Sequence, residues 1–161
     1  MAANISTDFK NDYGYSYTDA AIAYLLNKSY PCDYLMFTNG DNLYSGGFID
    51  GYIGKDMHES IDIIGFNFIS HYQMQAPTYE AGNSNDGTMI MLNSNFKRGE
   101  IDLGAFVIRL ELLNANHELR FVVNSQGKFY GVKEADGYLI YEASKLAKTS
   151  RIHRQSLMIH Q

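Results

Sequence analysis

The sequence predicts an α/β protein with a mixed, mostly parallel sheet flanked by helices. Segments whose apolar residues recur at helical spacing alternate with short apolar runs, and this alternation is typical of sheets with a substantial parallel part. The runs at 33–38, 61–69 and 152–159 are apolar enough for buried strands. A chain of 161 residues suits one core, so we expect a single domain over 1–161.

The first half of the chain contains two expected helices and two expected strands. Thr18 is suited to cap the first helix, and Tyr30-Pro31 ends it. The apolar stripe of this helix consists of Ala20, Ile22, Ala23, Leu25 and Leu26. Tyr34–Phe37 is typical of a central strand covered on both faces. A second helix, weakened by its glycines, is expected over 46–59, before the strand at 61–69.

The second half begins with a stretch that is rich in turn residues. We expect 73–88 to form a long surface loop and 135–148 to form a helix with Asp136 in its first turn. The segment 105–113 is apolar and follows a strand at its start. The other expected strands are 89–92, 101–103, 121–123, 129–132 and 152–159.

Charge and composition exclude several classes of function. The net charge is −5 and no block of Lys or Arg is present, which argues against non-specific binding of nucleic acid. An anionic ligand held by a metal ion stays possible, because the metal brings its own charge. Cys32 is the one cysteine, so neither an intrachain disulfide nor a cysteine zinc cluster can form. No signal-peptide pattern and no apolar run of about 18 residues occur, so we expect a soluble chain without a membrane segment.

A polar cluster, Thr38-Asn39-Gly40-Asp41-Asn42, follows the run at 34–37 directly. In open α/β sheets, ligands bind beyond the carboxyl ends of strands, where Asp41 is expected. A Mg²⁺ ion binds through one or two carboxylates together with substrate phosphates. The same residues are also good turn formers, and on spacing alone the simple turn is the favoured interpretation.

Four segments in order resemble glycosyltransferases of the GT-A fold, which use nucleotide-sugar donors. The segment 32–45 resembles their acidic motif at a strand end, and 11–22 resembles the loop and helix before it. The segment 101–109 resembles their acceptor side, and 133–138 resembles the acidic helix start that carries the base in inverting members. The resemblance covers roughly 11–160 and rests on order and spacing. It implies a Rossmann-like GT-A sheet.

The resemblance also implies roles for individual residues. Asp41 matches the last carboxylate of the Asp-x-Asp motif, which binds Mn²⁺ or Mg²⁺ and the donor diphosphate, while Asn39 stands in place of the first Asp. Asp19 is expected on the donor side. Asp136 matches the catalytic base, which takes the proton of the acceptor hydroxyl. His160 matches a late histidine that contacts the metal or the diphosphate.

The expected function is therefore transfer of a sugar from a nucleoside diphosphate to a carbohydrate or other hydroxyl acceptor, assisted by metal and with inversion. Few residues precede the segment at 11–14, so we expect the unit that cradles the nucleotide base to be missing. This feature and Asn39 leave two alternatives: an inactive sugar- or nucleotide-binding homologue, and a small α/β interaction protein. Gly104 is expected at a close approach of backbones beside the acceptor. Arg109 is expected to pair with Asp102, to pair with a carboxylate of the site, or to face solvent.

Overall fold

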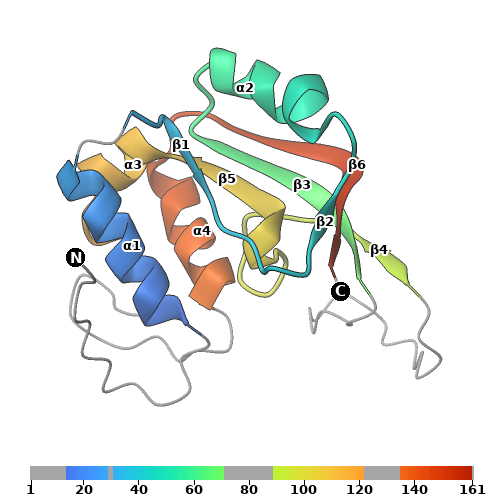
Figure 1. Cartoon of the computed structure of the whole chain (residues 1–161), viewed down its shortest axis with the longest axis horizontal. Coiled ribbons are helices and arrows are strands. Elements are labelled where there is room, and N and C mark those ends of the chain that lie inside the picture. The colour runs from blue at the N-terminus through green and yellow to red at the C-terminus, as the bar shows by residue number, and fades with distance from the viewer. Residues whose placement is uncertain (1–13, 29–30, 71–88, 122–134, 161) are drawn as a thin grey trace.

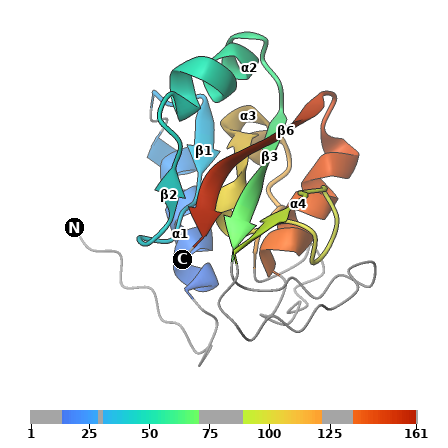
Figure 2. The same cartoon turned by 90° about the vertical axis from the view of Figure 1, so that its right-hand side faces the viewer.

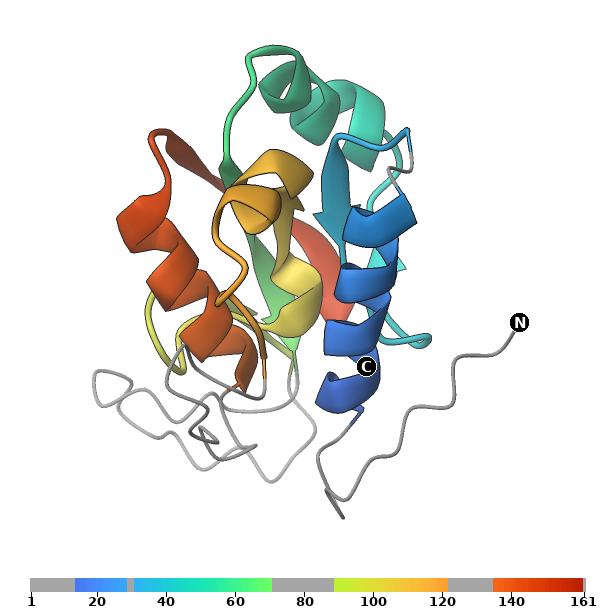
Figure 3. The same ribbon diagram turned by 90° about the vertical axis from the view of Figure 1, so that its left-hand side faces the viewer.

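A computed structural model describes residues 14–28, 31–70, 89–121 and 135–160. A curled sheet lies between two groups of helices (Figures 1 and 3). On one face lie α1 (Tyr15–Lys28), α3 (Leu110–Ala115) and α4 (Ala135–Leu146). On the other lie the π-helix η1 (Phe48–Ile53) and α2 (Gly54–His58). The predicted α/β class is confirmed.

Six strands form the described sheet. They are β1 (Tyr34–Met36), β2 (Leu43–Tyr44), β3 (Ile63–Ser70), β4 (Ile90–Leu92), β5 (Phe106–Arg109) and β6 (Ser150–His160). The order is β1-β5-β3-β6-β2, with β4 also pairing with β3. Among these pairs only β3 and β6 run parallel. The expectation of a mostly parallel sheet is therefore wrong, because β5 runs in the opposite direction between β1 and β3.

The ends of the strands nevertheless gather by direction. Because β5 is antiparallel to both β1 and β3, those two strands point the same way, and β6 is parallel to β3. We call the edge where β1, β3 and β6 end the carboxyl edge; it lies at the bottom of Figure 1, where β5 and α4 begin. Figure 2 shows β3 and β6 side by side along their length. The opposite edge, where β3 and β6 begin, is the amino edge.

The core follows β3 and β5. In β3, the residues Ile63, Ile64, Phe66 and Phe68 are buried, as expected for the run at 61–69. The helices add buried residues on both faces of the sheet: Ile22, Phe48, Ile53, Leu112, Leu113, Leu139, Ile140 and Ala143. The predicted helices near 18–30, 46–59 and 135–148 and the strands near 89–92 and 152–159 are confirmed with shifted ends.

Two expectations about the first half are wrong. Tyr34–Met36 is half-buried and lies at the end of the described sheet, not at its centre. Phe37, which follows β1, packs against another part of the chain: its ring centroid lies 5.3 Å from that of Phe121. Thr18 does not cap the first helix, because α1 already begins at Tyr15. The Thr18 hydroxyl instead donates to the carbonyl of Gly14, at 3.2 Å.

The expected strand at 101–103 is also wrong. Asp102 precedes a 3₁₀ turn, η2 (Leu103–Ala105), and accepts a hydrogen bond from the Gly104 N–H at 2.9 Å. This side-chain cap favours a turn over an extended strand, so β5 begins only at Phe106. The expected loop at 73–88 and strand at 129–132 lie outside the described residues, as does all of the strand at 121–123 except Phe121.

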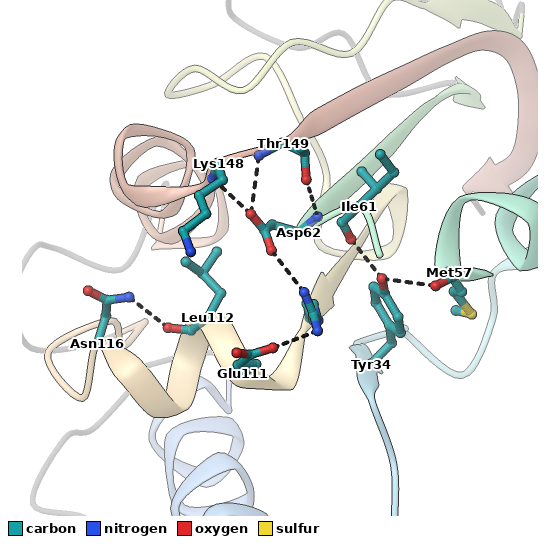
Figure 4. Close-up of polar contacts among 10 residues, drawn as sticks. Tyr34, Met57, Ile61, Asp62, Glu111, Leu112, Asn116, Lys148 and Thr149 are labelled. Carbon is teal, nitrogen blue, oxygen red and sulfur yellow. Dashed lines mark hydrogen bonds and ion pairs between the residues drawn. The ribbon is translucent and has the colours of Figure 1, made fainter. Parts of the chain in front are cut away.

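The amino edge is closed by a buried carboxylate, that of Asp62. Its Oδ2 accepts hydrogen bonds from the backbone N–H groups of Lys148 (2.8 Å) and Thr149 (3.1 Å), which precede β6 (Figure 4). Arg109 at the end of β5 lies 3.7 Å from Oδ1 and also pairs with Glu111, at 2.6 Å. Asp62 thereby ties the start of β3 to β5 and to the turn before β6.

Candidate functional site

The polar cluster after β1 forms a closed turn at the carboxyl edge. The Asn42 N–H donates to the Asn39 carbonyl at 3.3 Å, and the Thr38 hydroxyl donates to the same carbonyl at 2.9 Å. Asn39 and Asp41 are both exposed. The predicted turn is thus present, and it presents the Asp41 carboxylate at the edge where a ligand site was expected.

Pairing of β2 with β6 brings this turn to the end of the chain. Leu43 lies opposite Ile159 in an antiparallel pair. The next residue outward on β2 is Asn42 and the next on β6 is His160, so His160 ends β6 beside the turn that contains Asp41. Segments far apart in the sequence therefore meet at one place.

The Tyr44 hydroxyl connects the turn to the segment 102–105. It lies 2.8 Å from Thr38 Oγ1 and 3.2 Å from the carbonyl oxygen of Gly104, within hydrogen-bond distance of both. Burial raises the pKa of Tyr44, so the phenol stays protonated at neutral pH. Gly104 is closely approached by side chains and not, as expected, by another backbone: a Cβ there would lie 2.4 Å from Asn42 Nδ2 and 2.7 Å from Met158 Sδ.

His160 lies between a serine and a carboxylate. Its Nδ1 is 3.3 Å from the hydroxyl of Ser70, and its Nε2 is 3.9 Å from Asp102 Oδ2. Both the His160 and Asp102 side chains are mostly shielded from solvent. The hydrogen bond at one ring nitrogen orients the other toward the carboxylate.

Asp136 lies in the first turn of α4 and close to Asp102. Burial raises the pKa of its carboxyl to about 6; the Gly137 N–H lowers this pKa, the negative charge of Asp102 raises it further, and the Leu103 N–H lowers it. The Gly137 N–H donates to Asp136 Oδ1 at 2.8 Å. A carboxyl group whose pKa lies near neutrality can take and return a proton in one reaction cycle.

Two other predicted residues lie differently. Asp19 Oδ1 accepts a hydrogen bond from the Phe121 N–H at 2.8 Å, which ties α1 to the chain after α3. Arg109 does not pair with Asp102; it lies at the amino edge with Asp62 and Glu111, so that alternative is wrong. Arg109 ends β5 whereas Asp102 precedes that strand, and this separates the two residues by its length.

Sequence reasoning missed Tyr44 and Ser70 as residues of this site. Tyr44 lies two residues after the polar cluster, and Ser70 has a hydroxyl at the end of a long apolar strand. Each lies where a strand meets the carboxyl edge, and that position was the available signal. The side to which each points depends on register, which a single sequence does not contain.

A cation at this edge would need ligands from water or a bound phosphate in addition to those from the described protein residues. Within the described ranges, no three His, Cys, Asp or Glu side chains gather closely enough to hold a metal ion. Asn42 Oδ1 is buried and accepts no hydrogen bond from any described residue. Carboxylate and amide oxygens are ligand types that Mg²⁺ accepts beside water and phosphate oxygens, so Asp41 and Asn42 are of the right chemistry for such an ion.

No model of a known protein family matches the chain, and a search of curated proteins gives no match either. Among the described helices, none has both the length and the apolarity needed to cross a bilayer. The case for a function therefore depends on the chemistry of the carboxyl edge.

Proposed function

We propose that the chain is a glycosyltransferase, or part of one, with a GT-A-like sheet. It would transfer a sugar from a nucleoside-diphosphate donor to an acceptor hydroxyl, with a divalent cation and with inversion. One observation carries the proposal: Asp41, Asp102, Asp136 and His160, from four segments, gather at the carboxyl edge. Asp41, Asp102 and Asp136 lie in three of the segments that resemble the family, and His160 matches its late histidine; a chance likeness would not require them to meet.

In this mechanism Asp136 accepts the proton of the acceptor hydroxyl as its oxygen attacks the anomeric carbon. The raised pKa keeps the carboxyl a competent base near neutral pH, and the Gly137 and Leu103 N–H groups orient it. Asp41 and His160 would hold the cation. When bound, the cation would neutralise the charge that develops on the leaving diphosphate.

A second candidate is a module that binds a nucleotide or sugar without turnover. The observation that favours it is Asn39, an exposed amide where the family has a carboxylate. An amide oxygen is a weaker ligand for a hard cation than a carboxylate, so the donor diphosphate would be neutralised less well.

A binding experiment separates these candidates from a plain interaction protein. Mn²⁺ with a nucleoside diphosphate should raise the melting temperature of the intact chain. Asp41→Ala should abolish this rise, whereas Asp50→Ala, which removes an exposed carboxylate on η1, should leave it unchanged. The donor-site proposal is wrong if no nucleotide shifts the wild-type chain.

Turnover is then measured as release of nucleoside diphosphate from a panel of nucleotide sugars, with and without hydroxyl acceptors. Asp136→Asn should abolish turnover and retain binding. Binding with no turnover in the wild-type chain would favour the second candidate. The anomeric configuration of any product, read by NMR, tests inversion.

A further inference from the structure

The pairing of β3 with β6 is irregular just before the carboxyl edge. The 8 residues of β3 lie beside the 11 residues of β6. Register is regular from Ile63↔Ser150 to Phe66↔His153 and shifts on both sides of Asn67. Three residues of β6 have no partner on β3: Arg154, Gln155 and Leu157. They form a bulge that lengthens β6 relative to its neighbour.

This bulge decides which face the last residue of β6 occupies. Phe66 and Ser70 are an even number of residues apart on β3, so their side chains share a face. Their partners, His153 and His160, are an odd number of residues apart, which would place them on opposite faces of a regular strand. Because the number of extra residues in the bulge is odd, His153 and His160 nevertheless share a face, as their partners Phe66 and Ser70 do. Without it, Ser70 would lie opposite Leu157.

The side chains show the consequence. Before the bulge, His153 Nε2 lies 2.7 Å from Asp56 Oδ2 on α2. After the bulge, His160 lies against Ser70 and Asp102, with its ring centroid 6.5 Å from that of Phe68. A one-residue change in the extra length would turn His160 to the other face, away from Asp102.

The side chain of Asn67 bonds the bulge at Arg154 and bonds the chain after β4 at Asn93 and Ser94. Its Nδ2 donates to the Arg154 carbonyl inside the bulge and to Asn93 Oδ1, both at 2.9 Å. Its Oδ1 accepts from the Ser94 N–H at 3.0 Å. Asn67 is 1% exposed, so no water replaces these bonds without opening the sheet.

The chain after β4 completes the clamp. The guanidinium of Arg154 donates to the backbone carbonyl of Ser94 at 3.2 Å. The Ser94 hydroxyl bonds β3 and not the bulge: it donates to the Phe66 carbonyl at 2.7 Å. The bulge is therefore bonded from β3 and from this loop.

We infer that Asn67 is a positioning residue of the carboxyl edge: its amide pins the β6 bulge, and the pinned bulge directs His160 toward Asp102. The functional meaning of this device rests on the proposed function, in which His160 contacts the cation or the diphosphate. The structural statement does not depend on that function. A valine or leucine at this position would suit the apolar strand better, so the buried amide is explained by the bonds that it makes.

The test uses NMR spectra of the imidazoles in the intact chain without added ligand. In the wild type, the His160 ring should show a nuclear Overhauser contact with the Phe68 ring. Asn67→Asp keeps the shape and an acceptor for Ser94 but cannot donate to the Arg154 carbonyl. It should shift the His160 resonances and remove the contact with Phe68, whereas the resonances of His153, before the bulge, should stay in place.

Ser94→Ala is the matched control. It removes one buried hydrogen bond at the same place but retains the Ser94 N–H that bonds Asn67, so His160 should not move. Asn67→Leu, which removes all three bonds, should reproduce the effect of Asn67→Asp. Unchanged His160 spectra in the folded variants, or no contact with Phe68 in the wild type, would overturn the proposal. Loss of the fold in both Asn67 variants would also overturn it, since Asn67 would then serve the fold as a whole.

A second measurement connects the device to function. If the wild-type chain binds Mn²⁺ with a nucleoside diphosphate, Asn67→Asp should weaken that binding by about 10–100-fold, because His160 would no longer be oriented toward the site. If the wild type binds no nucleotide, the proposed function fails while the NMR result on Asn67 still stands.

Discussion

The two edges of the sheet treat a shielded aspartate in opposite ways. At the amino edge, Asp62 Oδ2 accepts two backbone N–H groups, and Oδ1 faces the guanidinium of Arg109. At the carboxyl edge, Asp136 also accepts backbone N–H groups, but its charged neighbour is Asp102, and its pKa rises to about 6. The difference teaches that hydrogen bonds alone do not decide the role of a carboxylate. A carboxylate with a cationic partner serves to hold the fold together, whereas burial and a like charge make a carboxylate a candidate base.

The largest expected effect comes from opening the amino edge. Asp62→Ala removes the acceptor of the Lys148 and Thr149 N–H groups and should lower the free energy of unfolding by about 4 kcal/mol. Urea denaturation measures this loss. Glu111→Ala, which removes the exposed partner of Arg109, should cost less than about 0.5 kcal/mol. Equal losses of unfolding free energy in the two variants would contradict the structural role assigned to Asp62.

At the carboxyl edge, removing the charge of an aspartate is expected to raise the free energy of unfolding. A rise in the pKa of Asp136 from 3.8 to about 6 means that its ionised form costs the fold about 3 kcal/mol. Asp136→Asn keeps an oxygen that accepts the Gly137 N–H and removes the charge. The variant should therefore be more stable than the wild type at pH 7.5 by up to this amount, and its turnover should fall at least about 100-fold.

The pH dependence follows from the direction of that shift. Between about pH 4 and pH 6 the folded wild type binds more protons at Asp136 than the unfolded chain does. Its stability should thus fall as the pH rises through this window, whereas Asp136→Asn should show no such component. The difference between the two chains should vanish below about pH 4. A constant difference across the window would show that the charge of Asp136 is not its source.

A medium effect is expected from the close approach at Gly104. Gly104→Ala would place a Cβ 2.4 Å from Asn42 Nδ2 and 2.7 Å from Met158 Sδ, so these side chains must shift, and the change should cost about 1–2 kcal/mol. Gly40→Ala is its control in the turn, since no atom lies within 4 Å of the added Cβ. Thermal unfolding compares the two variants. A larger loss at Gly40 would contradict the packing described here.

The smallest expected effect comes from a single hydroxyl. Tyr44→Phe keeps the ring contacts with Phe48 and Phe66 and removes the bonds to Thr38 and Gly104. Stability should fall by about 1 kcal/mol. Nucleoside-diphosphate binding, measured by calorimetry, should weaken because the turn at 38–42 loses its connection to 102–105. Unchanged binding would leave Tyr44 with a role in packing alone.

Much of the fold was predictable because it follows from local periodicity. The buried run at 61–69 and the apolar helix after 135 each indicate their own structure, and both are observed. The strand at 34–36 was also predictable, but its place in the sheet was not. An apolar run indicates that its residues are shielded from solvent, but not by which part of the chain. Here Phe121 shields Phe37, so the run does not require a central strand.

The candidate site was predictable as a set of residues and not as an arrangement. Asp41 lies in a turn, Asp136 at a helix start and His160 at a strand end, and the sequence indicates all three positions. Their shared location depends on the pairing of β2 with β6 and on the direction of β5. The contact between His160 and Asp102 depends further on the odd number of extra residues in β6.

The amino-acid sequence thus carries the kinds of elements, their approximate limits and the positions of the polar residues, because these depend on neighbours a few residues away. Strand order, the face that His160 occupies and the raised pKa of Asp136 depend on residues distant in the chain. The register of β6 against β3 depends on the bond from Asn67 to Arg154. The raised pKa of Asp136 depends on its burial and on the nearby charge of Asp102. Side chains along a strand point alternately to its two faces. An odd number of extra residues in a bulge therefore changes the face to which the later side chains point, and this is decided only in the folded sheet.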